Sequence, residues 1–385
     1  MNGNHFSLIL LSTNKCNAAC DYCFEDKTND RLSHERLRLI LDKVLDHMDA
    51  QHIGALTIHW QGGEAMLLPP EWYQEAFALI QDAAAARGKR VDHGLQTNML
   101  VYSPKWNAVI AEMFGNSVST SLDYPNLYRK IGGRSEDYNA LWARKVHMAR
   151  AAGIDVKVIS VPNQATLAVG AERFYEHFVD ELGVTDFQIN TPFPGGEANE
   201  VKKSLPLDIE ELARFHCELA DIWLDRGVHD DVRIGPFDEL LNYFTHRDAS
   251  LPCIWGQNCA DEFISIDARG YVAQCDCWVT SYPDYYFGNI FECDSLSDLL
   301  SSSRARQRFY ERPVKLMQRD CIECDYLTLC HGGCPVRTYT VHHSLFEKDP
   351  YCYLYKTLFR HMEKCATQLS AAVAGDPSKR PVLRN

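Results

Sequence analysis

The chain has 385 residues, and 46% of them are apolar, which is enough to bury a large core in two domains or in one large barrel with an appendage. Its 39 Lys and Arg residues and 52 Asp and Glu residues give a net charge of −13, which disfavours nucleic acid or an anionic membrane as the main partner. No apolar run approaches the roughly 18 residues of a membrane span, and no basic segment precedes the first short apolar stretch, so we expect a cytoplasmic protein.

Short apolar runs alternate with longer helical patterns from the N-terminus to about residue 235. The runs cover residues 6–12, 55–60, 93–98, 117–123, 155–161 and 186–190. In the first helical pattern, 33–49, apolar residues recur at helical spacing behind Ser33, a residue type that favours the N-cap. Six such repeats predict an α/β fold with a parallel sheet. Six are too few for a complete eight-fold barrel, so we expect a partial (β/α)6 TIM-like barrel over residues 1–235, with active groups at the strand ends.

The pattern changes after residue 236. Short strands and turns follow, with a cysteine every few residues, and elements of this kind are usually held together by metal or cluster ligation. We therefore expect a second, cysteine-rich domain over residues 236–365, and a flexible tail over 366–385. Fifteen cysteines, an odd number, indicate clustered metal ligands rather than disulfides, although Cys217 and Cys365 stand apart and are predicted to be structural thiols.

The stretch "CNAACDYC" places Cys16, Cys20 and Cys23 within eight residues, directly after the first predicted strand. Three thiolates at these spacings can hold a 4Fe-4S cluster from one loop, and they leave one iron without a protein ligand. An open position is what a catalytic metal needs. The alternative is a zinc site that takes its fourth ligand from His5 or from a distant cysteine.

The stretch "WQGGEAML" follows the second predicted strand. Gly62 and Gly63 would let the backbone come close to a ligand, and Glu64 offers an acceptor for an ammonium group. A Gly-Gly turn with a solvated glutamate is the alternative.

Together, the cysteine loop and the "QGGE" stretch resemble the radical S-adenosylmethionine (SAM) superfamily. The resemblance implies that the open iron binds SAM and that an electron, from a donor such as flavodoxin or ferredoxin, cleaves it to a 5′-deoxyadenosyl radical that abstracts a substrate hydrogen. It also implies a SAM pocket lined by Gln61, Gly62, Gly63, Glu64, Gln96, Thr97, Asn98, Ser121 and Asp123. Arg144, on the helix after the fourth strand, is expected either to reach the SAM carboxylate or to be a plain surface arginine.

The cysteines of the second half resemble those of the SPASM domain, an extension of radical SAM enzymes that modify peptides and proteins. The resemblance implies two auxiliary 4Fe-4S clusters, each with four protein ligands. The first would use Cys253, Cys259, Cys275 and Cys334, and the second Cys321, Cys324, Cys330 and Cys352. Two four-thiolate zinc sites are the alternative. Cys277 and Cys293 stay outside these sets, and Cys277 is expected to be either an alternative ligand or an inert thiol.

Asp276 directly follows one of these cysteines. In anaerobic sulfatase-maturating enzymes, which oxidise Cys or Ser to formylglycine, an aspartate at this place takes a proton from the substrate. The resemblance therefore implies a catalytic base, because oxidation must remove a proton as well as an electron. A turn-forming aspartate that accepts backbone N–H bonds is the alternative.

The resemblance leaves the reaction open between related groups. Maturases of ribosomally made peptides install crosslinks such as cyclophanes, ethers or thioethers. Departures from the sulfatase group, among them "GGEAML" without a proline after the glutamate and "SLDYP" in place of Ser-x-Asp-Gly, favour this kind of maturase. Formylglycine formation stays as the alternative reaction, and a non-catalytic iron-sulfur or zinc scaffold as the alternative of another class.

Overall fold

The computed structural model describes residues 4–192, 207–228, 231–246, 251–256, 259–261, 263–317 and 321–375. Seven parallel strands form the first part of the fold. They are β1 (His5–Thr13), β2 (Ala55–Gly62), β3 (Arg90–Leu95), β4 (Ser117–Ser121), β5 (Asp155–Ser160), β6 (Asp186–Ile189) and β7 (Arg233–Gly235). β1, β2 and β3 pair in order, as do β4 to β7, and a parallel bridge from Gln96 to Ser119 joins the two groups. The predicted partial barrel is confirmed.

The strands differ from the prediction in two places. β3 lies three residues earlier than expected, because Gln96–Asn98 leave the strand and bond to neighbouring strand ends, for example through the Asn98 amide, which donates to Glu64 Oε2 at 2.7 Å. β7 has only three residues, too short to carry a period that a sequence pattern can show.

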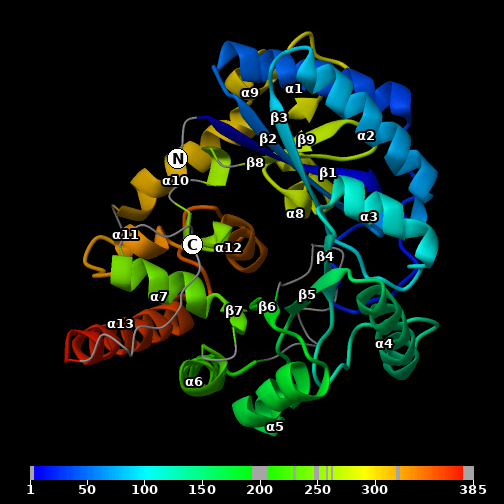
Figure 1. The fold of residues 1–385 in the computed structure, drawn as a ribbon. Helices are drawn as coiled ribbons and strands as arrows, with labels where there is room; N and C mark the ends of the chain where they lie inside the picture. Colours follow the sequence, from blue (N-terminus) through cyan, green and yellow to red (C-terminus); the bar gives the residue numbers. More distant parts are fainter. Residues whose placement is uncertain are drawn as a thin grey trace.

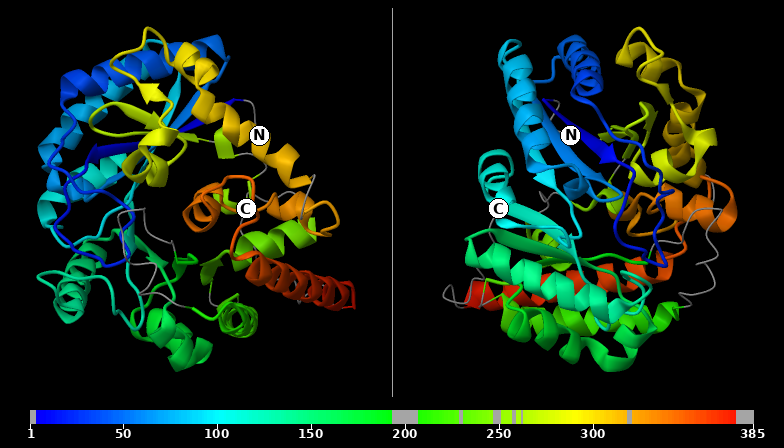
Figure 2. Two further views of the ribbon diagram at one scale, coloured as in Figure 1. Left: turned by 180° about the vertical axis from the view of Figure 1, so that it is seen from behind. Right: turned by 90° about the vertical axis from the view of Figure 1, so that its right-hand side faces the viewer.

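The helices between the strands lie on the outside of the barrel (Figures 1 and 2). They are α1 (His34–Ala50), α2 (Pro70–Ala85), α3 (Asn107–Met113), α4 (Ser135–Ala151), α5 (Gln164–Tyr175) and α6 (Ile209–Ile222). α1 follows its prediction closely: Ser33 caps it by accepting a hydrogen bond from the Arg36 amide at 3.2 Å. Its six predicted apolar positions, Leu37, Ile40, Leu41, Val44, Leu45 and Met48, are buried against the strands.

The C-terminal half closes the open side of the barrel (Figure 1, light green to red). Its elements are α7 (Phe237–His246), β8 (Phe263–Ile266), β9 (Tyr271–Ala273), α8 (Asp276–Ser281), β10 (Gly288–Asn289), α9 (Leu296–Ser302), α10 (Arg304–Met317), α11 (Leu327–Cys330), α12 (Pro335–His342) and α13 (Cys352–Gly375). β8 pairs in parallel with β1, and β9 and β10 continue the sheet as antiparallel strands. The barrel sheet therefore runs on across residue 236.

One hydrophobic core joins the two halves. It includes Leu10 of β1, Trp278 of α8 and Phe359 of α13, each fully buried. α13 packs along α6 and α7, and it continues to Gly375, so residues 366–375, which we expected to begin the tail, are helical. Ala366 is buried at this contact, which explains why the helix persists there. Residues 376–385 of the predicted tail lie outside the described residues.

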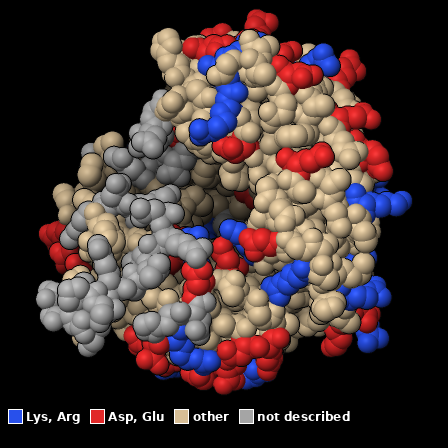
Figure 3. All heavy atoms as spheres, in the orientation of Figure 1, with Lys and Arg blue, Asp and Glu red and all other residues tan. Residues whose placement is uncertain are grey.

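Among the described helices, none is long and apolar enough to cross a membrane. Figure 3 shows a hollow in the centre of the face seen in Figure 1, with basic and acidic side chains at its bottom.

Candidate active site

Two adjoining cavities lie between the strand ends of the barrel and the C-terminal half. We call the first the barrel cavity. It measures about 290 Å³, and the three cysteines of the first loop line it together with the ends of β2, β3 and β4. Eight of the predicted SAM contacts line it: Gln61, Gly62, Gly63, Glu64, Gln96, Thr97, Asn98 and Ser121.

The cysteine loop is held against the loop between β4 and α4. The amides of Ala19 and Asp21 donate to the carbonyls of Lys130 and Tyr128 at 2.8 and 2.9 Å, and the Lys130 ammonium pairs with the Asp21 carboxylate at 2.5 Å. These contacts fix the loop from the side opposite β2, so the thiols of this loop face a preformed space.

Gly62 and Gly63 are required by the protein backbone itself. A Cβ atom on Gly63 would lie 2.5 Å from the Lys15 carbonyl oxygen, and one on Gly62 would lie 2.2 Å from that of Thr13. The amide of Gly63 donates to Thr13 O at 2.9 Å. The two glycines therefore let the end of β2 pack against the start of the cysteine loop, and they also line the barrel cavity, where we expected the backbone to approach a ligand.

Glu64 is almost completely buried, at 2% exposure. Its carboxylate accepts hydrogen bonds from the Met66 amide (2.9 Å), the Thr97 hydroxyl (2.5 Å) and the Asn98 amide (2.7 Å). Burial raises the pKa of this carboxyl above its ordinary value. Glu64 thus ties the ends of β2 and β3 together, while lining the barrel cavity.

The second cavity, which we call the extension cavity, measures about 510 Å³. Cys253, Cys259, Cys275 and Cys334 all line it, although Cys334 is about sixty residues away from Cys275 in the sequence. Burial, and then the neighbouring charges of the other three thiols, raise the pKa of Cys259. The structure therefore brings together the four cysteines predicted for the first auxiliary site.

Cys277 lines the same cavity as a fifth thiol, and its Sγ lies within 4.8 Å of the ligand atoms of Cys275 and Asp276. A separate, small cavity is lined by the second predicted set: Cys321, Cys324, Cys330 and Cys352.

Asp276 lines both cavities, at the first residue of α8. Its Oδ2 accepts a hydrogen bond from Gln61 Nε2, at the end of β2, at 2.9 Å. Burial raises the pKa of this carboxyl, which makes it a better proton acceptor than an exposed aspartate.

Comparison with known proteins agrees with this geometry. The Radical SAM superfamily matches residues 10–162, the segment that carries the cysteine loop and the ends of β2 to β4. The chain is a radical SAM enzyme. It is 24% identical to the serine-type anaerobic sulfatase-maturating enzyme of Bacteroides thetaiotaomicron over 83% of this chain and 80% of that one. It is 25% identical to the PqqA peptide cyclase of Gluconobacter oxydans over 90% of both chains.

The fold of this radical SAM enzyme matches two solved structures over most of its length. anSMEcpe with bound AdoMet and the Cp18Cys peptide has a TM-score of 0.80 at 22% identity, over 96% of this chain and 99% of that one. Streptococcus suis SuiB bound to its precursor peptide SuiA has a TM-score of 0.59 at 16% identity, over 90% of this chain and 75% of that one. The fold is thus a partial barrel with a SPASM-type extension.

A radical SAM enzyme uses SAM and a 4Fe-4S cluster, and the residues of the barrel cavity suit both. Three thiols from one loop are the donor set of a cluster with one open iron. Burial raises the pKa of Cys16 to about 11 and that of Cys23 to about 12, so a bound cation has to stabilise their thiolates. Polar groups from three strand ends face the same space.

The remaining two residues of the predicted SAM pocket lie elsewhere. Arg144 is exposed on α4 and lines neither cavity. Asp123 is buried behind the barrel cavity, where it accepts from the Tyr22 hydroxyl (2.5 Å) and pairs with Arg129 Nε (3.1 Å). Arg129 lines the barrel cavity, and Arg144 does not.

Sequence reasoning missed several charged residues that line the barrel cavity of this radical SAM enzyme, among them Arg129, Glu25 and Arg337. Arg129 lies in a loop, which has no periodic pattern. The sequence signal for it was therefore only an arginine close after the fourth predicted strand, in "SLDYPNLYR". Glu25 follows the last cysteine of the loop by two residues and lines the barrel cavity; burial, and then the charge of Asp276, raise its pKa. Arg337, three residues after Cys334, is buried and lines both cavities.

Proposed function

We propose that this enzyme oxidises a side chain of a ribosomally made peptide, which binds where the barrel and extension cavities meet. The curated relatives named above mature sulfatases or cyclise a peptide, and two solved relatives contain a bound peptide. The observation that carries the proposal is the position of Asp276, a buried carboxyl that lines both cavities and is held by Gln61.

Cys16, Cys20 and Cys23 hold the SAM-binding cluster in this proposal. Bound there, the cluster and SAM supply a 5′-deoxyadenosyl radical, which removes a hydrogen atom from the substrate. Arg129 binds the SAM carboxylate, because its guanidinium lines the cavity while Asp123 and the ring of Tyr22 keep it in place. The exposed Arg144 takes no part.

Cys253, Cys259, Cys275 and Cys334 hold one auxiliary 4Fe-4S cluster in this proposal, and Cys321, Cys324, Cys330 and Cys352 hold another. The grouping of each set around its own cavity supports this division. Fully ligated clusters suit the removal of electrons from the substrate, and a small electron-transfer protein such as flavodoxin or ferredoxin serves as the external donor.

Asp276 takes the proton that substrate oxidation releases. Gln61 donates to its Oδ2 and so orients the carboxylate toward the place where the two cavities meet. The neighbouring Glu25 carries no such bond from Gln61, and its raised pKa favours the neutral form beside Asp276.

The product we propose is a crosslink within the peptide, such as a cyclophane, ether or thioether. The apolar wall of the extension cavity, with Ile9, Phe24, Phe263 and Trp278, supports a substrate with an aromatic or aliphatic side chain at the reacting position.

Formylglycine formation is the second candidate. The observation in its favour is the extent of the match to anSMEcpe, 99% of whose chain is covered, against 75% of SuiB. Both reactions use the same proton acceptor, so the residues of the site do not separate them.

Mass spectrometry of a candidate peptide encoded beside this gene, co-expressed with the enzyme, tests the proposal. A mass lower by one pair of hydrogen atoms, with fragments that stay joined, is the expected result. Conversion of a Cys or Ser to an aldehyde supports the second candidate. Release of 5′-deoxyadenosine with dithionite distinguishes any such enzyme from a non-catalytic scaffold, which releases none.

A further inference from the structure

Helices α6 and α13 lie side by side on the outside of the molecule (Figure 1), and no described residue of either helix lines the two cavities. α6 carries Cys217 and Asp221, and α13 carries His361 and Cys365. The spacing within each pair is four residues, which places both members on the same face of their helix. Each helix therefore presents two metal-ligating side chains to the other.

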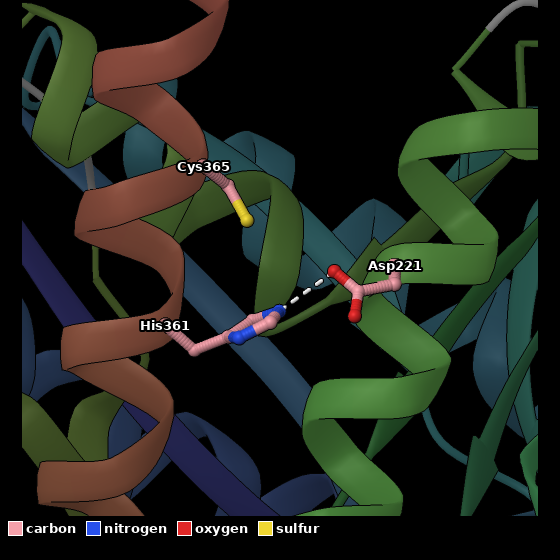
Figure 4. A group of neighbouring side chains, drawn as sticks. All are labelled: Asp221, His361 and Cys365. Atoms are coloured by element: carbon pink, nitrogen blue, oxygen red, sulfur yellow. Dashed lines mark hydrogen bonds and ion pairs between the residues drawn. The ribbon is translucent and has the colours of Figure 1, made fainter.

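The side chains meet in the groove between the two helices. His361 Nε2 and Asp221 Oδ1 are 2.8 Å apart. The ligand atoms of Asp221, His361 and Cys365 all lie within 4.8 Å of one another. Figure 4 shows the three side chains pointing toward one another, with the Cys365 sulfur above the bonded pair.

Cys217 lies next to this group of three, on the same face of α6 as Asp221. Burial raises the pKa of its thiol to about 12, and the next largest causes are the negative charges of Asp221 and Cys365. Cys217 lies one helical turn before Asp221, and its sulfur is outside the set of three ligand atoms that lie within 4.8 Å of one another.

We propose that Asp221, His361 and Cys365, with Cys217 as the fourth ligand, bind one zinc ion between α6 and α13. Two thiolates, one imidazole and one carboxylate form a mixed sulfur, nitrogen and oxygen set of the kind that tetrahedral zinc takes. At zinc bond lengths of about 2.0 to 2.3 Å, neighbouring ligand atoms lie roughly 3.3 to 3.8 Å apart. The ligand atoms of Asp221, His361 and Cys365, all within 4.8 Å of one another, are close to this geometry, and Cys217 would reach the ion by a rotation of its side chain.

The ion would fasten the C-terminal helix to the barrel. α13 begins at Cys352, one of the cysteines around the small cavity, and it packs on α6. A zinc ion on His361 and Cys365 therefore links the second cysteine set to a barrel helix through a single rigid element. The site is structural, because all four positions are taken by the protein.

The test uses the full-length enzyme, reconstituted anaerobically with iron and sulfide. One equivalent of zinc is added, loosely bound metal is removed on a desalting column, and the metals are counted. We expect about one zinc per chain beside the iron, and a zinc K-edge absorption spectrum with both sulfur and nitrogen or oxygen neighbours. Zinc should also raise the Tm.

His361→Ala and Cys365→Ala should each lose the zinc and the Tm increase while keeping their iron. Cys293→Ser, a change at a cysteine outside all the sets, is the matched control and should keep both metals. Asp221→Asn, at an exposed position, should weaken zinc retention without disturbing the fold. A zinc spectrum with sulfur neighbours only would place the ion in the cluster cysteines and overturn the proposal. So would zinc that both α13 variants retain, or no retained zinc at all.

Discussion

The surroundings of the Asp276 carboxyl suit the role of proton acceptor that we propose for it. It follows a cysteine of the first auxiliary set, it is buried, and it accepts from Gln61 across the gap between the barrel and the extension. Asp276→Asn keeps the shape but cannot accept the proton. We expect product formation to fall by about 100-fold or more, the usual range for loss of a general base.

SAM cleavage separates this role from a structural one. Asp276→Asn should still release 5′-deoxyadenosine and should keep its full iron content, as measured in the same preparation. If the variant forms product at the original rate, Asp276 is only a turn residue.

Gly63 lies in close contact with the backbone at the start of the cysteine loop. In Gly63→Ala the new methyl group would lie 2.5 Å from Lys15 O and 2.7 Å from Asn14 O, backbone atoms that move only with the loop. We expect the variant to lose about four irons per chain, the content of one cluster, together with SAM cleavage.

Gly94→Ala on the neighbouring strand is the control, because its methyl group would meet only His59 Nδ1, at 3.4 Å. It should keep all its iron. Equal iron in the two variants would mean that the loop tolerates the displacement.

Arg129 and Arg144 are a natural matched pair. Lysine at 129 keeps a positive charge beside Asp123 but loses the guanidinium fork, and a hydrogen bond to a charged group contributes about 1.5 to 3 kcal/mol. We therefore expect Arg129→Lys to raise the KM for SAM by about tenfold or more, with unchanged iron. Arg144→Ala should leave the KM unchanged; the reverse pattern would restore the assignment made from the sequence.

At the level of elements, strand ends and the loops after them carry the site. The sequence was sufficient to predict the loop after β1 and the capped helix α1, because a cysteine motif and helical periodicity are local signals. It also grouped eight residues at the ends of β2 to β4 correctly. It missed β7 and the pairing of β8 with β1, because short strands and long-range pairing leave no local pattern.

The contacts that these residues make within the protein were harder to predict from the sequence than their places at the strand ends. The glycine pair, which we expected to approach a ligand, also approaches the Thr13 and Lys15 carbonyls. Glu64, which we expected to accept from an ammonium group, also accepts hydrogen bonds from three groups of the protein. Such contacts depend on which backbone passes nearby, and that is decided by packing across the sheet.

The place of Cys334 in the first cysteine set gives a prediction about the iron content of double variants. Cys334 directly precedes α12 and lies, in sequence, between Cys330 and Cys352, yet it lines the extension cavity with Cys253, Cys259 and Cys275. Pairing Cys334→Ala with Cys259→Ala should therefore cost about four irons, no more than either change alone. Pairing Cys334→Ala with Cys352→Ala should cost about eight. Iron analysis that gives the opposite result would reassign Cys334 to the second set.

At the scale of the whole molecule, a single core joins the barrel to the extension, so the two cavities keep a fixed relation to each other. Clusters bound in the extension therefore lie at set positions relative to the barrel cavity, and the substrate reaches both from one space. In the function that we propose, this arrangement separates two tasks: the first loop generates the oxidant, and the extension receives electrons and a proton.

The central claim is that Cys16, Cys20 and Cys23 hold the only cluster that cleaves SAM. The most direct test replaces all three by alanine and measures iron and 5′-deoxyadenosine after anaerobic reconstitution. The account predicts a fall from about twelve to about eight irons per chain and no SAM cleavage. Loss of all the iron would show that the clusters are not divided as proposed, and SAM cleavage by the variant would contradict the claim outright.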